Sequence, residues 1–172
     1  MGGSPSKSSC LVLGLPKSGK TALCESLTLG PSASCPRYQA TVGYRLYESP
    51  TIRFIELGGT VHKHWKSLFK GIHDEKWPLK SIILCIGDPD GVSASKALLL
   101  WMYAYLRRTH TIRMVIIVTC NMSGAIKVSQ GLQELFQGRV YLVNLRYPRN
   151  PLQGDPTVDV SPIWKLFSEK KG

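Results

Sequence analysis

The sequence lacks the patterns that mark membrane-spanning, disulfide-framed and zinc-binding proteins. No uncharged apolar run reaches about 18 residues, the length that predicts a membrane span. The five cysteines form no Cys-x-x-Cys pair, which favours reduced, structural thiols in the cytosol. The four histidines form no His-Glu-x-x-His pattern, so no zinc site is expected. These absences predict a soluble cytoplasmic protein that is attached to membranes at most peripherally.

Acidic residues are scarce relative to basic ones. The chain has 11 Asp and Glu against 22 Lys and Arg, which gives a formal net charge of +11. Such a field attracts anionic partners of any kind, including nucleotides, acidic proteins, lipid headgroups and nucleic acids. The basic residues are spread along the chain without the interleaved aromatic residues typical of RNA-binding motifs. No specific nucleic-acid partner is therefore expected, and a solvated basic face is the simpler interpretation.

The most informative motif is a phosphate-binding loop with the pattern G-x-x-x-x-G-K-T. It follows a short apolar run at 10–13, which predicts a buried strand, and precedes an apolar pattern with helical spacing at 21–29. Its glycines allow backbone N–H groups to approach a polyphosphate, Lys20 can reach the β- and γ-phosphates, and the Thr21 hydroxyl can ligate Mg²⁺. The residues expected to contact nucleotide here are Gly14, Leu15, Pro16, Lys17, Ser18, Gly19, Lys20, Thr21 and Ala22.

Beyond this loop, strands are expected to alternate with helices. Residues 44–47 and 51–57 predict an antiparallel strand pair, and further strands are expected at 82–86, 114–118 and 140–145. Helices are expected around 65–69, 93–108 and 132–136, with a last one that has Ser161 as its N-cap. The alternation predicts an α/β protein with the three-layer fold of P-loop NTPases, built on a mostly parallel six-stranded sheet with one antiparallel edge strand. Residues 1–8 are expected to be a flexible segment and 9–172 one domain.

The chain resembles the Arf-type small GTPases over essentially its whole length. Thr41-Val-Gly43 is similar to the Thr-x-Gly of the family's switch I, and Glu56-Leu-Gly58-Gly59 is similar to its Asp-x-Gly-Gly motif. Trp65, seven residues after Gly58, resembles the aromatic residue that follows this motif. Glutamate in place of aspartate and the short spacing to Trp65 are most similar to one branch of the family. The resemblance implies a small GTPase fold that binds GTP or GDP with Mg²⁺ and recruits effectors as a molecular switch.

The resemblance also implies roles for individual residues. Thr21 and Thr41 would ligate Mg²⁺, Thr41 would sense the γ-phosphate, and Glu56 would stand in the outer metal shell through water. The Gly59 N–H would bond the γ-phosphate. The alternatives are a turn residue for Thr41 and a tight bend for the Gly58-Gly59 pair.

One departure from the family concerns hydrolysis. Thr60 occupies the position of the glutamine that orients the attacking water, and a threonine is too short to do so. The resemblance therefore implies very slow GTP hydrolysis. His62 or His64 is a possible substitute, although an exposed histidine on a helix is more often plain surface.

Two further departures concern the base. Asn121-Met-Ser-Gly124 stands where the family has Asn-Lys-x-Asp, so the carboxylate that pairs with guanine is missing. Residues 146–150 replace the family's Ser-Ala-type loop after the strand at 140–145. Guanine selectivity is therefore expected to rest on Asn121 and the backbone alone.

Two functions are compatible with the sequence. The first function is a GTP-binding switch that is slow or locked, and the second is a pseudo-GTPase interaction module that binds nucleotide weakly or not at all. A small-molecule kinase is disfavoured because no lid-like insertion is present.

The start of the chain fits the pattern M-G-x-x-x-S, so Gly2 is a candidate for myristoylation, with an unlipidated flexible terminus as the alternative.

Overall fold

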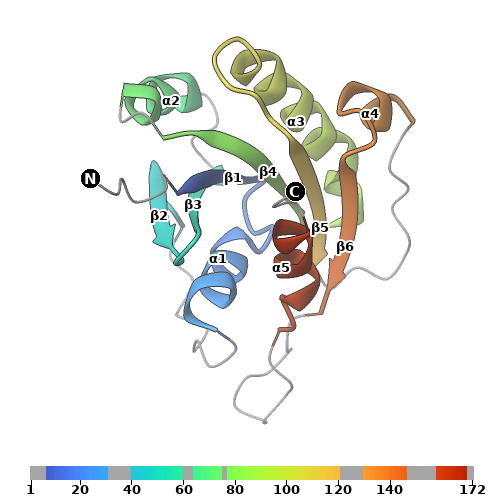
Figure 1. The fold of residues 1–172 in the computed structure, drawn as a ribbon. Coiled ribbons are helices and arrows are strands. Elements are labelled where there is room, and N and C mark those ends of the chain that lie inside the picture. The colour runs from blue at the N-terminus through green and yellow to red at the C-terminus, as the bar shows by residue number, and fades with distance from the viewer. Residues whose placement is uncertain are drawn as a thin grey trace.

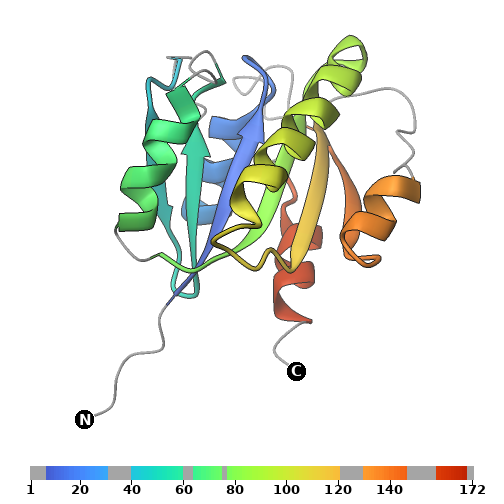
Figure 2. The ribbon, with the colours of Figure 1, turned by 90° about the horizontal axis from the view of Figure 1, so that it is seen from above.

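A six-stranded sheet with helices on both faces forms the framework of the protein (Figure 1 and Figure 2). The computed structural model describes residues 7–30, 40–59, 64–74, 77–120, 130–146 and 158–169. The strands are β1 (Ser8–Gly14), β2 (Tyr44–Glu48), β3 (Ile52–Leu57), β4 (Leu79–Ile86), β5 (Met114–Cys120) and β6 (Val140–Leu145). The helices are α1 (Lys20–Leu29), α2 (Trp65–Asp74), α3 (Val92–Leu106), α4 (Gln130–Leu135) and α5 (Ser161–Ser168), with a 3-10 turn, η2 (Pro89–Gly91), before α3.

The sheet has the order β2-β3-β1-β4-β5-β6. Among these strands only the β2–β3 pair is antiparallel, and the other neighbours run parallel. The predicted α/β architecture is therefore confirmed, including its single antiparallel edge strand. None of the helices in the described ranges is both long and apolar enough to cross a bilayer.

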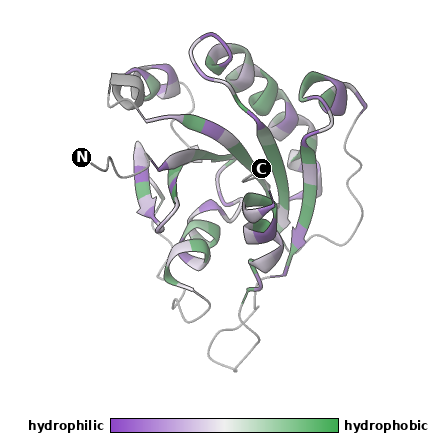
Figure 3. Cartoon of the chain, viewed as in Figure 1, coloured by the Kyte–Doolittle hydropathy of each residue, from purple (hydrophilic) through white to green (hydrophobic). Residues whose placement is uncertain are grey.

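Each face of the sheet has its own core. Leu11 and Leu13 of β1 belong to the core under α2, α3 and α4, whereas Cys10 and Val12 belong to the core under α1 and α5. All four side chains are fully buried. A strand that is buried on both faces must be apolar throughout, which is why the central strands are largely green in Figure 3.

The cysteines of the described segments are structural. Cys10, Cys24 and Cys85 are free thiols and buried, and Cys120 is buried as well. Burial raises the pKa of Cys10 to about 12, which keeps its thiol protonated and unreactive at neutral pH.

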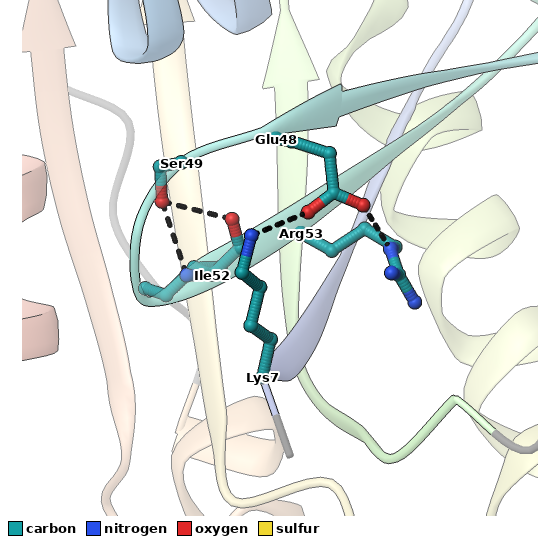
Figure 4. A network of polar contacts seen from close by, with 5 residues as sticks. All are labelled: Lys7, Glu48, Ser49, Ile52 and Arg53. Carbon is teal, nitrogen blue, oxygen red and sulfur yellow. Dashed lines mark hydrogen bonds and ion pairs between the residues drawn. The ribbon is translucent and has the colours of Figure 1, made fainter. Parts of the chain in front are cut away.

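The β2–β3 hairpin closes through side chains of its turn (Figure 4). The Ser49 hydroxyl donates to the Ile52 carbonyl at 2.8 Å and accepts from the Ile52 N–H at 3.0 Å. Glu48 pairs with Arg53 on β3 and, at 3.1 Å, with Lys7, which precedes β1. Lys7 and Glu48 are largely exposed, so this pair contributes only about 0–1 kcal/mol.

Helix α5 begins differently from the prediction. Ser161 was expected to be the N-cap, but the structure places Val160 at that position and Ser161 inside the helix. The Ser161 N–H instead donates to the Asp159 carboxylate at 2.9 Å. A carboxylate two residues upstream is a charged acceptor, and it replaces the serine hydroxyl at the positive end of the helix.

Phe54 anchors α5 to the sheet. It is fully buried on β3 and meets Trp164 and Phe167 edge to face, at centroid distances of 5.8 Å and 6.0 Å. We expect Phe54→Ala to lower the free energy of unfolding by about 3–5 kcal/mol, because it removes both ring contacts and leaves a cavity. Urea denaturation followed by circular dichroism measures the loss. Leu142→Ala, at a side chain that is 40% exposed, is the control and should change stability by no more than about 0.5 kcal/mol.

Candidate functional site

The phosphate-binding loop joins the end of β1 to the start of α1. Gly14 is the last residue of β1, and Lys20 is the first residue of α1. Gly19, immediately before the helix, has a left-handed backbone with φ 87°, which a side chain disfavours. No side chain caps the N-terminus of α1. The first N–H groups of this helix are therefore available to an anion, together with the positive end of its dipole.

The two strands that flank β1 are each followed by a glycine whose backbone lies close to the loop. A Cβ atom at Gly59, after β3, would lie 2.6 Å from the Pro16 nitrogen, and one at Gly87, after β4, would lie 2.9 Å from the Ser18 Cα. Both contacts are with backbone, which cannot swing away. Sequence reasoning named Gly59 but missed Gly87, although a glycine directly after a buried parallel strand is a signal of close backbone approach.

Two hydrogen bonds hold the Gly58 backbone in place. Its N–H donates to the Gly43 carbonyl at 2.8 Å, and its carbonyl accepts the indole N–H of Trp65 at 3.0 Å. Trp65 is fully buried at the start of α2. These bonds fix the segment after β3 against both the segment before β2 and the start of α2.

A cavity of about 250 Å³ lies between the loop and the segment before β2. Its lining consists of Pro16, Lys17, Ser18, Gly19, Lys20, Thr21, Ala40, Thr41, Glu56 and Gly59. All of these except Ala40 were singled out from the sequence, from three separate motifs. Of the other candidates, Gly14, Leu15 and Ala22 lie next to the cavity rather than on its wall.

The side chain of Lys20 folds back into the phosphate-binding loop that precedes it. Its Nζ donates to the carbonyls of Gly14 and Leu15 at 3.1 and 2.8 Å, and it is 6% exposed. Burial lowers the pKa of Lys20, and the negative charge of Glu56 opposes that shift. The ammonium group is thus held on the wall of the cavity, where an anion would meet it.

Glu56 is the centre of a buried hydroxyl cluster. Its carboxylate, 1% exposed, accepts from the Thr21 hydroxyl at 2.6 Å and from the Thr41 hydroxyl at 3.1 Å, both on Oε1. The hydroxyl of Tyr47 donates to Oε2 at 3.0 Å. A buried carboxylate without donors would be strongly destabilising, so these bonds are needed to compensate its desolvation.

The donor set of this cluster fits Mg²⁺. The Thr21 and Thr41 hydroxyl oxygens are 3.5 Å apart, and the Glu56 carboxylate is within hydrogen-bonding distance of both. Hydroxyl and carboxylate oxygens are hard donors of the kind that Mg²⁺ prefers beside phosphate oxygens. The role of Glu56 in an outer shell stays a prediction.

Tyr47, like Gly87, is a residue of this site that sequence reasoning missed. In the β2–β3 register Arg45 opposes Glu56 and Tyr47 opposes Phe54, so Tyr47 and Glu56 are diagonal neighbours on one face of the sheet. Burial raises the pKa of Tyr47, and the Glu56 charge raises it further, so the phenol stays a donor. The alternation of residues along the two expected strands could have indicated the contact between Tyr47 and Glu56, but only if the register of the strand pair had been known.

Several predicted positions lie outside the described residues. These are Gly2, Thr60, His62, the segment 121–129 with Asn121 and Gly124, and most of the loop that begins at Arg146. His64 and Arg146 are described and exposed. The expectations for hydrolysis, base recognition and lipidation therefore stay predictions.

The chain is similar to solved small GTPase structures. The Arl6 (BBS3) small GTPase of Trypanosoma brucei with bound GppNp is 18% identical, with 94% of each chain covered and a TM-score of 0.54. A chain of the GTP-bound IFT22/74/81 structure of Trypanosoma brucei is 19% identical, with 94% of this chain and 93% of that chain covered and a TM-score of 0.56. No protein-family model and no curated protein matches the sequence. At these identities the likeness shows the fold, and the predicted small GTPase fold is confirmed.

Gly59→Ala tests the close approach of β3 to the loop. The added Cβ meets backbone atoms of Leu15 and Pro16 at 2.8 and 2.6 Å, so we expect the free energy of unfolding to fall by about 1–3 kcal/mol. Gly131→Ala, in α4 with open space around the new Cβ, should be neutral or stabilise by up to about 1 kcal/mol. Urea titrations of both variants measure the difference. Equal effects would show that the loop does not need Gly59.

Tyr47→Phe tests the hydroxyl cluster. The variant removes one donor from the buried Glu56 carboxylate, and hydrogen bonds to charged groups contribute about 1.5–3 kcal/mol, so we expect a loss of this order in the free energy of unfolding. Tyr44→Phe, on the same strand at a side chain that is 39% exposed, should leave stability nearly unchanged. Thermal and urea unfolding of the two variants give the comparison. A Tyr47→Phe protein as stable as the Tyr44→Phe protein would contradict the compensating role of Tyr47.

Proposed function

We propose that this protein is an Arf-like, guanine nucleotide-binding switch that hydrolyses GTP slowly or not at all and recruits a partner protein when loaded. One observation carries the proposal: a single cavity is lined by the phosphate-binding loop, by Thr41, by Glu56 and by Gly59. These residues come from separate parts of the chain, and their groups are those that a nucleotide with Mg²⁺ requires. The small GTPase fold supports the same function.

Each residue of the cavity has a definite task in this proposal. Lys20 neutralises charge on the β- and γ-phosphates, and the loop N–H groups and the N-terminus of α1 hold their oxygens. The Thr21 and Thr41 hydroxyls ligate Mg²⁺, Glu56 orients that shell, and the Gly59 N–H bonds the γ-phosphate. The metal ion, when bound, supplies charge that stabilises the phosphates.

The Glu56 cluster supports a slow or locked switch. Glutamate is one methylene longer than the aspartate of the Arf motif, and its Oε1 contacts the hydroxyls of both Thr21 and Thr41. Thr41 is thus held near the loop by the protein itself. Its position should then depend less on the γ-phosphate than a switch residue that is held by nucleotide alone. Thr60, too short to orient water, supports slow hydrolysis independently.

The finer assignments follow from the sequence. The segment Ile55-Glu-Leu-Gly-Gly59 and the short spacing to Trp65 favour the branch of Arf-like protein sixteen. A myristoyl chain on Gly2 with nearby Lys7 would give peripheral membrane attachment to a protein that is otherwise cytoplasmic. The missing carboxylate at Gly124 favours the second candidate, a pseudo-GTPase interaction module without base selectivity.

Lys20→Ala is the direct test of nucleotide binding. We expect it to abolish the affinity for GTP with Mg²⁺, because the variant removes the buried ammonium group that the loop carbonyls hold on the wall of the cavity, while the protein stays folded. Isothermal titration calorimetry measures binding, and circular dichroism measures folding. Lys165→Ala, at a side chain that is 77% exposed on α5, is the matched control and should bind as the wild type does. Unchanged affinity in Lys20→Ala would rule out the loop as the site.

A further inference from the structure

A second, larger hollow lies between α2 and the end of α3, away from the candidate nucleotide site. It has a volume of about 500 Å³ and shares no lining residue with the nucleotide cavity. Its lining consists of Lys66, Ser67, Phe69, Lys70, Tyr105, Leu106, Arg108, Thr109 and His110. The helices α2 and α3 cover the same face of the sheet, and Figure 3 shows hydrophilic residues on α2 and on the turn that follows α3.

The floor of this groove is apolar. Phe69 and Leu106 are buried, and the rings of Phe69 and Tyr105 are tilted against each other at a centroid distance of 6.1 Å. Tyr105 is only partly buried, so its ring remains available from the groove. The volume is within the range of about 300–1,000 Å³ typical of ligand sites. The groove can therefore accept an inserted apolar side chain.

The rim of the groove is basic. Lys66, Lys70 and Arg108 are exposed, and the described residues that line the groove include no carboxylate. Within the described residues no ion pair joins any of these three to an acidic side chain. Lys66 lies over the Trp101 ring at 5.3 Å, and Lys70 is four residues further along the same helix face, where like charges repel. An anionic partner would relieve that repulsion.

We propose that the groove between α2 and α3 binds an acidic peptide segment of a partner protein, which inserts an apolar side chain beside Phe69 and Tyr105 and places carboxylates against Lys66, Lys70 and Arg108. A flat lipid surface or the backbone of a nucleic-acid duplex would use the basic rim but would leave the apolar floor uncovered. The combination of a positive rim with an aromatic floor therefore favours a peptide.

The test is selection from a random-peptide phage library on the full-length protein, with counter-selection on the K70E/R108E double variant. We expect selected sequences rich in Asp and Glu around a Leu, Phe or Trp. A fluorescein-labelled selected peptide should bind the wild type at physiological salt in fluorescence anisotropy and should bind K70E/R108E at least tenfold more weakly. Changing its apolar anchor to Ser should weaken binding to a similar extent.

The control distinguishes binding in the groove from attraction by the net positive charge of the whole protein. R139E/K165E carries the same change in net charge at two exposed positions outside the groove and should bind the peptide as the wild type does. Circular dichroism verifies that both variants are folded, and K70Q/R108Q replaces K70E/R108E if the latter is not. Equal loss in both double variants, selected peptides without acidic residues, or co-sedimentation with phosphatidylserine vesicles in place of peptide binding would each overturn the proposal.

Discussion

The buried carboxylate of Glu56 is the constraint on which the site depends. A charge that is 1% exposed persists only if donors surround it, and the donors come from the start of α1, from the segment before β2 and from β2 itself. Thr21, Thr41 and Tyr47 are therefore held together by one group. The loop, the segment that carries Thr41 and the antiparallel edge of the sheet become parts of a single arrangement.

The sheet makes this arrangement possible by bringing strand ends together. Strands β3 and β4 flank β1, and the glycines that follow them, Gly59 and Gly87, allow the backbone to touch the phosphate-binding loop. Binding sites of open α/β sheets form at the carboxyl ends of the strands, and this cavity has that location. The groove between α2 and α3 lies on one outer face instead and shares no lining residue with this cavity.

The sequence predicted what depends on local pattern. The phosphate-binding loop, the β2–β3 pair and the alternation of strands and helices follow from residue type and spacing, and the fold is confirmed. Tyr47 and Gly87 were missed because their roles depend on strand register and on packing between distant segments. The N-cap at Ser161 was wrong because the helix begins one residue earlier: the N–H groups of Ile163 and Trp164, which a Ser161 cap would accept, donate to the Val160 carbonyl instead. The groove between α2 and α3 was also missed, since its walls come from helices that only the fold brings together.

The central claim is that this cavity binds nucleotide through its phosphates, with a weak preference for the base. Competition of GTP and ATP against a fluorescent GTP analogue, in the presence of Mg²⁺, tests it most directly. Because Gly124 supplies no carboxylate, the preference should be limited to one or two net hydrogen bonds, and we expect GTP to bind better than ATP by only about tenfold. If neither nucleotide displaced the analogue, or if the analogue itself did not bind, the account would be contradicted and the pseudo-GTPase would be the better description.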